Sequence, residues 1–464
     1  MSNHLRRKRA YSVTPVVVDT IVGGTALAIT CYFAEIPLGG SFLSLVSSAS
    51  IAMSIVLLCN MAVGLYSGGA RLEKTFLRRG VVGGFTAIMV LQLLNILLEH
   101  TLAVEALSLS IVAIVAINAT WRYAHGAIRD HIPHSPLKIV IIGAGQRAAF
   151  LSRRMRRLRD RRHFKGWQFY QLQSLCSDIE NNGDQVEYGQ NFSDWLDQEN
   201  PDLIVLANEV DEPIDPQASH TLMQWKLSGT EVLDLEEFVE RELGQLAVEK
   251  MTPEWILLSQ GFKPRSTFFD GVNYLLNATL AIIVFTLTLP IILATMLAIY
   301  LEDGRRDNAG IIYKQCRVGV DGRLFDVFKF RSMGINAESN GAQWAQENDP
   351  RVTRVGAFIR KYRIDELPQL FNVLRGDMCF VGPRPERPEF VNQLNQKIPY
   401  FDFRHTVKPG LTGWAQINYP YGASDEASQE KLKYDLYYIK NRSFILDFFV
   451  LVRTVEVVLF GKGR

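Results

Sequence analysis

Four apolar segments near the N-terminus constrain the fold of this chain more than any other feature. They cover residues 13–34, 42–66, 80–98 and 102–121. Each approaches the roughly 20 apolar residues that a helix needs to cross a bilayer. We therefore predict a four-helix transmembrane domain over residues 1–125. Most of the remaining chain has the composition of a soluble protein, so the sequence indicates a membrane part joined to soluble domains.

Basic residues flank these segments on one side of the predicted membrane. Lys and Arg concentrate in cytoplasmic loops, so both the N-terminus and everything from residue 122 are expected in the cytoplasm. A basic run before one apolar stretch also resembles a signal peptide, but three further apolar segments follow and favour a spanning helix. The flanking residues are Arg6, Arg7, Lys8, Arg9, Arg71, Lys74, Arg78, Arg79, Arg122 and Arg129.

Charge and cysteine content argue against a nucleic-acid-binding protein, a disulfide-stabilised protein and a zinc protein. Lys and Arg number 50 against 48 Asp and Glu, a net charge of +2, so no overall field favours a nucleic-acid partner. The five cysteines show no spacing typical of a disulfide framework or a zinc site, which fits a reducing compartment. They are Cys31, Cys59, Cys176, Cys316 and Cys379.

A second domain is predicted over residues 137–250. Its first strand ends at Gly143, a basic helix follows to Arg159, and further strands are expected at 167–172 and 203–206. Alternating strands and helices predict a parallel sheet and a Rossmann-like cytosolic domain.

The turn Gly143-x-Gly145-x-x-Ala148 in this domain has two interpretations. It could cradle a phosphate at a helix N-terminus, or its glycines could serve only a tight turn. No acidic residue closes the second strand, where a ribose would be bound. We favour the structural interpretation and assign no cofactor here.

Residues 272–301 form a fifth apolar run, interrupted by Pro290. Proline kinks a helix, and basic residues on both sides place both ends in the cytoplasm. We therefore predict a re-entrant helix that bends at Pro290 and returns to the same face; a kinked spanning helix is the alternative. The flanking residues are Lys263, Arg265, Arg305 and Arg306.

Acidic and basic residues crowd together near residue 365. Asp365 and Glu366 follow Arg360, Lys361 and Arg363. Asp365 is expected to cap a helix that Gly376 ends, and a helix N-terminus favours anions. A diphosphate, a divalent metal and a carboxylate nucleophile could meet there, and a surface salt-bridge cluster is an equally good interpretation.

A strand predicted at 324–330 carries further cations. Its alternating pattern places Lys329 and Arg331 on one face. Two cations on one strand face suit phosphate oxygens, although a solvated face would look the same.

Five motifs in order, together with the bent helix, resemble the bacterial sugar transferase family, the monotopic polyprenyl-phosphate phosphoglycosyl transferases. The resemblance covers residues 262–464, and the N-terminal domains resemble the large members of the family that initiate exopolysaccharides. The motifs are Lys329–Met333, Asp365–Gln369, Arg375–Met378, Val381–Pro385 and Lys408–Gln416.

The resemblance implies a monotopic α/β catalytic domain and a ping-pong reaction in a bacterial inner membrane. Asp365 would attack a UDP-sugar, Glu366 would assist, Mg²⁺ would lie beside both, and undecaprenyl phosphate among the membrane lipids would accept the phosphosugar. The phosphate ligands would be Lys329, Arg331, Arg360 and Arg384.

Two departures from the family pattern and two alternative functions accompany this interpretation. Leu289-Pro290 replaces the usual Ser-Pro, and the 302–310 turn is longer and more charged. A glycosyltransferase that releases UDP, or a non-catalytic nucleotide-binding assembly protein, are the alternatives. The motifs do not specify the sugar. Residues 444–460 could lie along the membrane or pack on the core, and a homodimer is a hypothesis for cross-linking.

Overall fold

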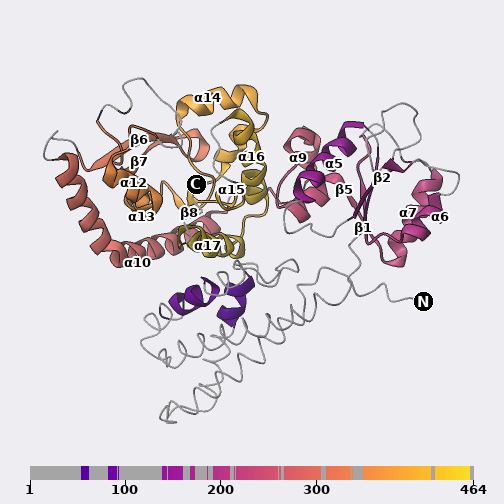
Figure 1. The fold of residues 1–464 in the computed structure, drawn as a ribbon, viewed down its shortest axis with the longest axis horizontal. Coiled ribbons are helices and arrows are strands. Elements are labelled where there is room, and N and C mark those ends of the chain that lie inside the picture. Colours follow the sequence, from indigo (N-terminus) through magenta and orange to yellow (C-terminus); the bar gives the residue numbers. More distant parts are fainter. Residues whose placement is uncertain are drawn as a thin grey trace, which may run out of the picture. The chain divides into compact units, whose positions relative to one another are not determined.

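The chain divides into two compact units, Met1–Leu243 and Gly244–Arg464, each with its own hydrophobic core (Figure 1). Of the four predicted spanning helices, the first and fourth lie outside the described residues, while 54–61 and 82–90 are helical and fall within the second and third. The computed structural model describes residues 54–61, 82–90, 92, 138–143, 145–159, 168–172, 185–186, 192–209, 214, 216–259, 261–262, 266–304, 310–335, 337, 349–419 and 424–459.

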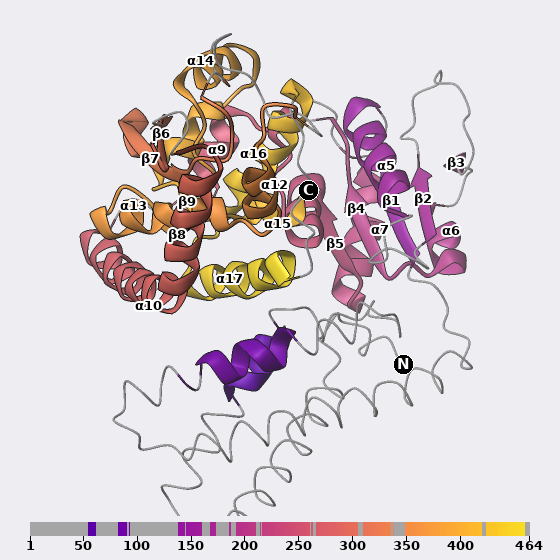
Figure 2. The same ribbon diagram turned by 60° about the vertical axis from the view of Figure 1, so that its left-hand side comes forward.

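The first unit contains a parallel five-stranded sheet in the order β3-β2-β1-β4-β5 (Figure 2). Val140 and Ile142 of β1 pack with Ile204 of β4, Leu196 of α6 and Leu222 of α7, so α6 and α7 cover one face. The elements are β1 Lys138–Ile142, α5 Gly145–Arg159, β2 Gln168–Leu172, β3 Gln185–Val186, α6 Phe192–Glu199, β4 Leu203–Leu206, α7 Pro216–Ser228, β5 Glu231–Asp234, α8 Leu235–Phe238 and η3 Val239–Leu243.

The second unit surrounds two small sheets with helices. An antiparallel hairpin joins β6 to β7, and β8 pairs in parallel with β9. The strands are β6 Ile312–Val318, β7 Leu324–Phe330, β8 Cys379–Val381 and β9 Gly410–Thr412. The α-helices are α9 Pro253–Leu258, α10 Thr267–Ile299, α12 Arg354–Lys361, α13 Leu370–Arg375, α14 Pro388–Lys397, α15 Trp414–Asn418, α16 Asp425–Lys440 and α17 Phe444–Leu459. Shorter turns are η4 Val248–Lys250, η5 Tyr300–Gly304, η6 Val320–Gly322, η7 Ile364–Gln369 and η8 Phe401–Thr406.

Helix α10 is the one helix among the described residues that is long and apolar enough to cross a membrane. It begins after Ser266, whose hydroxyl accepts a hydrogen bond from Phe269 N, and it continues through Pro290. Figures 1 and 2 show a bent helix. The hydroxyls of Thr286 and Thr288 donate to the carbonyls four residues earlier, at 2.9 and 2.7 Å, a contact that itself bends helices.

One side of α10 packs against β7, α12 and α13, the elements that surround Asp365 in the chain. Ala281 packs with Val327 of β7 and with Leu370 and Val373 of α13. Farther along, a second cluster joins α10 to the end of β7 and to α12. Burial of these side chains holds β7, α12 and α13 against one helix, because each buried aliphatic side chain contributes about 1.5–3 kcal/mol to the free energy of folding.

Helix α17 packs partly on the core. Val450 and Val452 are fully buried, whereas Phe444 and Ile445 are exposed. Asp447 accepts a hydrogen bond from the Tyr438 hydroxyl at 2.8 Å. Side chains of α17 therefore pack on the core, as one of the two interpretations predicted, while Phe444 and Ile445 at its start remain available to a membrane surface.

We expect the Asp447→Asn variant to melt higher than the wild type at pH 7.5 but not at pH 4.5. Burial raises the pKa of Asp447 to about 6, although Tyr438 and Arg442 act to lower it. A carboxyl with a raised folded-state pKa stabilises the fold below its unfolded pKa, and this contribution is lost as the pH rises through about 6. Asparagine keeps the acceptor and does not ionise. Melting temperatures in detergent at both pH values test this, and an equal difference at both would contradict it.

Candidate active site

The backbone around Asp365 differs from the predicted helix cap. Asp365 lies inside the 3₁₀-helix η7, which is preceded by Arg363 in the left-handed conformation with φ of 56° and without a side-chain cap. The prediction that Asp365 caps the helix is therefore wrong, because α13 begins only at Leu370. The predicted end is confirmed: Gly376 closes α13 with φ of 82°.

Glu366 is held by two guanidinium groups. Its Oε1 accepts from Arg384 Nη2 at 2.7 Å and from Arg363 Nη1 at 3.3 Å. Burial acts to raise the pKa of Glu366, but the charges of Arg384 and Lys329 outweigh it and hold the pKa at about 2. Glu366 is therefore an ionised, fixed carboxylate.

Asp365 has a different environment from its neighbour. Among the described residues, none donates a hydrogen bond to its carboxylate. Burial and the adjacent Glu366 raise the pKa of Asp365 to about 6, while Lys329, Arg384 and Arg360 lower it. One carboxylate is thus held by two guanidinium groups, whereas the other accepts no hydrogen bond from the described residues.

The positive charges of three of the four predicted phosphate ligands lower the pKa of the Asp365 carboxyl. These residues are Lys329, Arg360 and Arg384. Burial and the charge of Arg384 lower the pKa of Lys329 to about 8. Arg331 follows Lys329 at the end of β7, and its Nη2 is buried without a partner among the described residues. A buried donor without a partner is costly, so Arg331 is suited to bind an anion.

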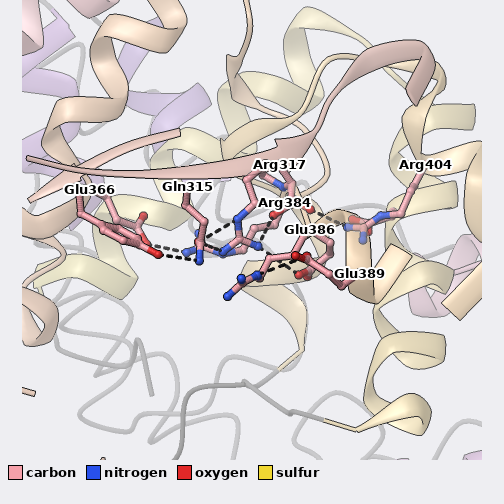
Figure 3. A network of polar contacts seen from close by, with 11 residues as sticks. Gln315, Arg317, Glu366, Arg384, Glu386, Glu389 and Arg404 are labelled. Atoms are coloured by element: carbon pink, nitrogen blue, oxygen red, sulfur yellow. Dashed lines mark hydrogen bonds and ion pairs between the residues drawn. The ribbon is translucent and has the colours of Figure 1, made fainter. Parts of the chain in front are cut away.

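Two arginines that the sequence analysis did not single out hold the loop that carries Arg384 (Figure 3). Arg317 Nη1 donates to the Pro385 carbonyl at 3.1 Å. Arg404 Nη2 donates to the Arg384 carbonyl at 2.8 Å and to Asp435 Oδ2 at 3.0 Å. Both arginines hold the backbone of the loop by hydrogen bonds to its carbonyls. Nothing in the linear sequence distinguishes them from other arginines, because their role depends on long-range contacts.

Asn372 connects β7 to α13. Its side chain is fully buried, accepts from Phe328 N at 3.1 Å and donates to the Asp326 carbonyl at 2.7 Å. These two bonds flank Val327, two residues before Lys329. Asn372 thereby sets the distance between the strand that carries Lys329 and the helix that follows Asp365.

We expect Asn372→Ala to lower the free energy of unfolding by about 2–3 kcal/mol, because two buried backbone groups of β7 lose their partners. Thermal unfolding of the purified protein in detergent measures this. Asn395→Ala, at an exposed position of α14, is the control and should change stability little. Equal, small effects of both substitutions would contradict the role assigned to Asn372.

The glycine turn of the first unit supports its structural interpretation. A side chain at Gly143 would meet the Ala207 backbone at 2.5 Å. At the N-terminus of α5, Arg147 N donates to Glu209 Oε1 at 2.9 Å. A carboxylate from the chain itself therefore lies where a phosphate would bind a helix N-terminus.

The residues around Asp365 also fit a magnesium ion that shares its ligands with a substrate. No group of three or more His, Cys, Asp or Glu side chains suited to a metal occurs in the described part of the chain. Mg²⁺ commonly takes one or two carboxylates and completes its shell with water and substrate phosphates. Asp365 and Glu366 could supply that protein share.

Comparison with known proteins places this geometry in a family. The family model for bacterial sugar transferases matches residues 269–461. The UDP-N-acetylgalactosamine-undecaprenyl-phosphate N-acetylgalactosaminephosphotransferase of Aeromonas hydrophila is 37% identical over 276 residues, 58% of this chain and 63% of that protein. The UDP-glucose:undecaprenyl-phosphate glucose-1-phosphate transferase of Escherichia coli is 41% identical over 191 residues, 41% of each chain.

The chain spans less than two thirds of the length of both these relatives. A shorter relative is covered almost fully: an uncharacterized sugar transferase of Bacillus subtilis is 40% identical over 189 residues, which are 41% of this chain and 88% of that protein. The predicted resemblance is confirmed, and the chain belongs to the bacterial sugar transferase family.

Proposed function

We propose that this protein transfers a sugar 1-phosphate from a UDP-sugar to undecaprenyl phosphate, releasing UMP and starting an exopolysaccharide chain. The observation that carries the proposal is the difference in hydrogen bonding between two adjacent carboxylates. Glu366 is bound by Arg384 at 2.7 Å, whereas Asp365 has no hydrogen-bond donor among the described residues. The names of the two relatives from Aeromonas hydrophila and Escherichia coli agree with this reaction.

The reaction proceeds in two displacements at one phosphorus atom. An Asp365 carboxylate oxygen attacks the sugar-bearing phosphorus, the bond to the UMP oxygen breaks, and an aspartyl-phosphosugar remains. An oxygen of the lipid phosphate then attacks the same phosphorus, and the bond to Asp365 breaks, which restores the carboxylate. No net proton is taken up or released when both phosphates enter and leave ionised. Two moderate barriers replace one high barrier.

The surrounding cations stabilise the charge that spreads over the transferred group. The Asp365 carboxylate already interacts electrostatically with three of them, Lys329, Arg360 and Arg384, whose charges lower its pKa. The unpartnered Nη2 of Arg331 is suited to a phosphate oxygen of the donor. A bound Mg²⁺ would neutralise charge on the diphosphate. Preorganised charges of this kind stabilise a transition state without reorganisation at the moment of reaction.

The membrane position follows from the two substrates. A UDP-sugar is water-soluble, whereas the phosphate of a polyprenyl lipid lies at the membrane surface. We propose that α10 enters the inner membrane and returns to the cytoplasmic face, with the four N-terminal spanning helices as a further anchor. The hydroxyls of Thr286 and Thr288 supply hydrogen bonds just before Pro290, where a Ser-Pro pair is replaced by Leu289-Pro290.

Nucleotide release from the purified full-length chain tests the proposal. The protein is supplied in lipid with undecaprenyl phosphate, Mg²⁺ and a panel of UDP-sugars. UMP as the product supports phosphosugar transfer, and the active donor names the sugar. UDP as the product would support the glycosyltransferase instead. Exchange of labelled UMP into the UDP-sugar without lipid acceptor tests the covalent intermediate separately.

A further inference from the structure

A small polar pocket lies beside the first turns of α10, and none of the residues assigned to catalysis lines it. Its polar lining is Asp270, Asn273, Tyr274, Asn277, Lys408 and Arg442. Two of these side chains fix its wall to the protein body. Tyr274 donates to the Leu374 carbonyl at 2.9 Å, and Asn277 Oδ1 accepts from Phe380 N at 2.6 Å.

The pocket carries an excess positive charge. Arg442 pairs with Asp270 at 3.5 Å. The Lys408 ammonium lies 5.7 Å from the centre of the Tyr274 ring, and in the part of the chain that the structure describes it makes no ion pair. Lys408 is half-buried. A half-buried ammonium without a carboxylate is stabilised by an external anion.

Exposed apolar side chains occur on α10, whose first turns line the pocket, and at the neighbouring start of α17. Phe268 is 80% exposed, Leu275 is 66% exposed and Ile445 is 66% exposed. The rings of Phe269 and Phe444 stack at 4.5 Å, which joins the start of α10 to the start of α17 (Figures 1 and 2). Cations bordered by exposed apolar side chains are typical of the level where a membrane surface meets its head groups.

We propose that Lys408 and Arg442 bind the phosphodiester group of a membrane phospholipid beside α10. The ammonium of Lys408 contacts a phosphate oxygen, the Arg442 guanidinium adds a second positive charge, and the acyl chains lie along the exposed apolar surface of α10. The proposal rests on α10 lying in a bilayer and not on phosphosugar transfer. It assigns to the Lys408-Pro409-Gly410 motif a role in lipid binding.

Lipid counting by native mass spectrometry of the full-length protein tests this proposal. The protein is equilibrated in detergent micelles that contain either phosphatidylglycerol or diacylglycerol with the same acyl chains. We expect a bound phosphatidylglycerol that diacylglycerol does not replace. Lys408→Gln should weaken this binding about five- to tenfold, the effect of one basic residue at an anionic surface, and Lys408→Arg should retain it.

The control is Lys397→Gln on α14, an exposed lysine that pairs with Asp425. Equal phosphatidylglycerol binding by the wild type and Lys408→Gln would overturn the proposal, as would an equal loss in Lys397→Gln. Displacement of the lipid by millimolar inorganic phosphate would assign the pocket to a free phosphate instead. The measurement does not use turnover, so it can be repeated in the Asp365→Asn background and fails independently of the proposed reaction.

Discussion

Replacing Asp365 with asparagine is expected to abolish transfer, lowering kcat/KM by at least about 10,000-fold. The amide keeps the size of the carboxylate but is not a nucleophile toward phosphorus, and loss of a covalent nucleophile commonly has an effect of this size. The exchange of labelled UMP into the UDP-sugar should disappear as well. The fold should be kept, because no described residue donates a hydrogen bond to Asp365.

Asp321→Asn provides the matched control for this substitution. Asp321 is exposed in the turn between β6 and β7 and has φ of 54°, a conformation that asparagine adopts readily. Its variant should retain wild-type rates. UMP release by Asp365→Asn at a rate close to that of the wild type would show that Asp365 is not the nucleophile, and a non-catalytic role for the motif would then have to be considered.

Hydrophobic patterning predicted the regular elements that are buried and continuous. The strands expected to end at Gly143 and to cover 167–172 and 203–206 correspond to β1, β2 and β4. Strand β3 has two residues and β5 includes two acidic residues, so neither has a run of apolar residues that periodicity can detect. Patterning detects burial, and in β5 only Leu233 is buried.

Local signals predicted the end of α13 and failed at its start. Gly376 adopts a left-handed conformation that favours glycine. Arg363 adopts a similar conformation, although arginine has no preference for it. The sequence therefore favoured Asp365 as the cap, since aspartate is a good cap. The ion pair of Arg363 with Glu366, only three residues later, accompanies this backbone turn, and no residue preference in the sequence predicts it.

The candidate site also has a part that the sequence predicts and a part that it does not. Adjacent carboxylates and two cations on one strand are visible in the sequence, because neighbours in the chain stay neighbours in space. The choice of Arg384 as the partner of Glu366 is a contact across 18 residues. The support of its loop by Arg317 and Arg404 depends on contacts of 68 and 20 residues. No spacing rule within one chain reveals such pairs.

Arg384→Gln is expected to lower kcat/KM by about 100- to 10,000-fold, the range typical of losing a preorganised charge beside a developing negative charge. The substitution removes the closest hydrogen-bond donor of Glu366. It also removes one of the three positive charges that lower the pKa of Asp365. Arg384→Lys keeps a charge but not the planar guanidinium, so a partial recovery is expected. Arg387→Gln, in the same loop and paired with Glu389, is the control.

A double substitution separates the role of Arg384 in stability from its role in catalysis. In Arg384→Gln the buried Glu366 loses its closest partner, and an uncompensated buried charge is destabilising. Adding Glu366→Gln removes that charge, so the melting temperature should recover while the activity stays low. If activity recovered together with stability, Arg384 would act only by holding Glu366. Recovery of stability alone, with an activity below that of the Glu366→Gln single variant, would place the Arg384 charge on the transferred phosphate, because the fold no longer needs it there.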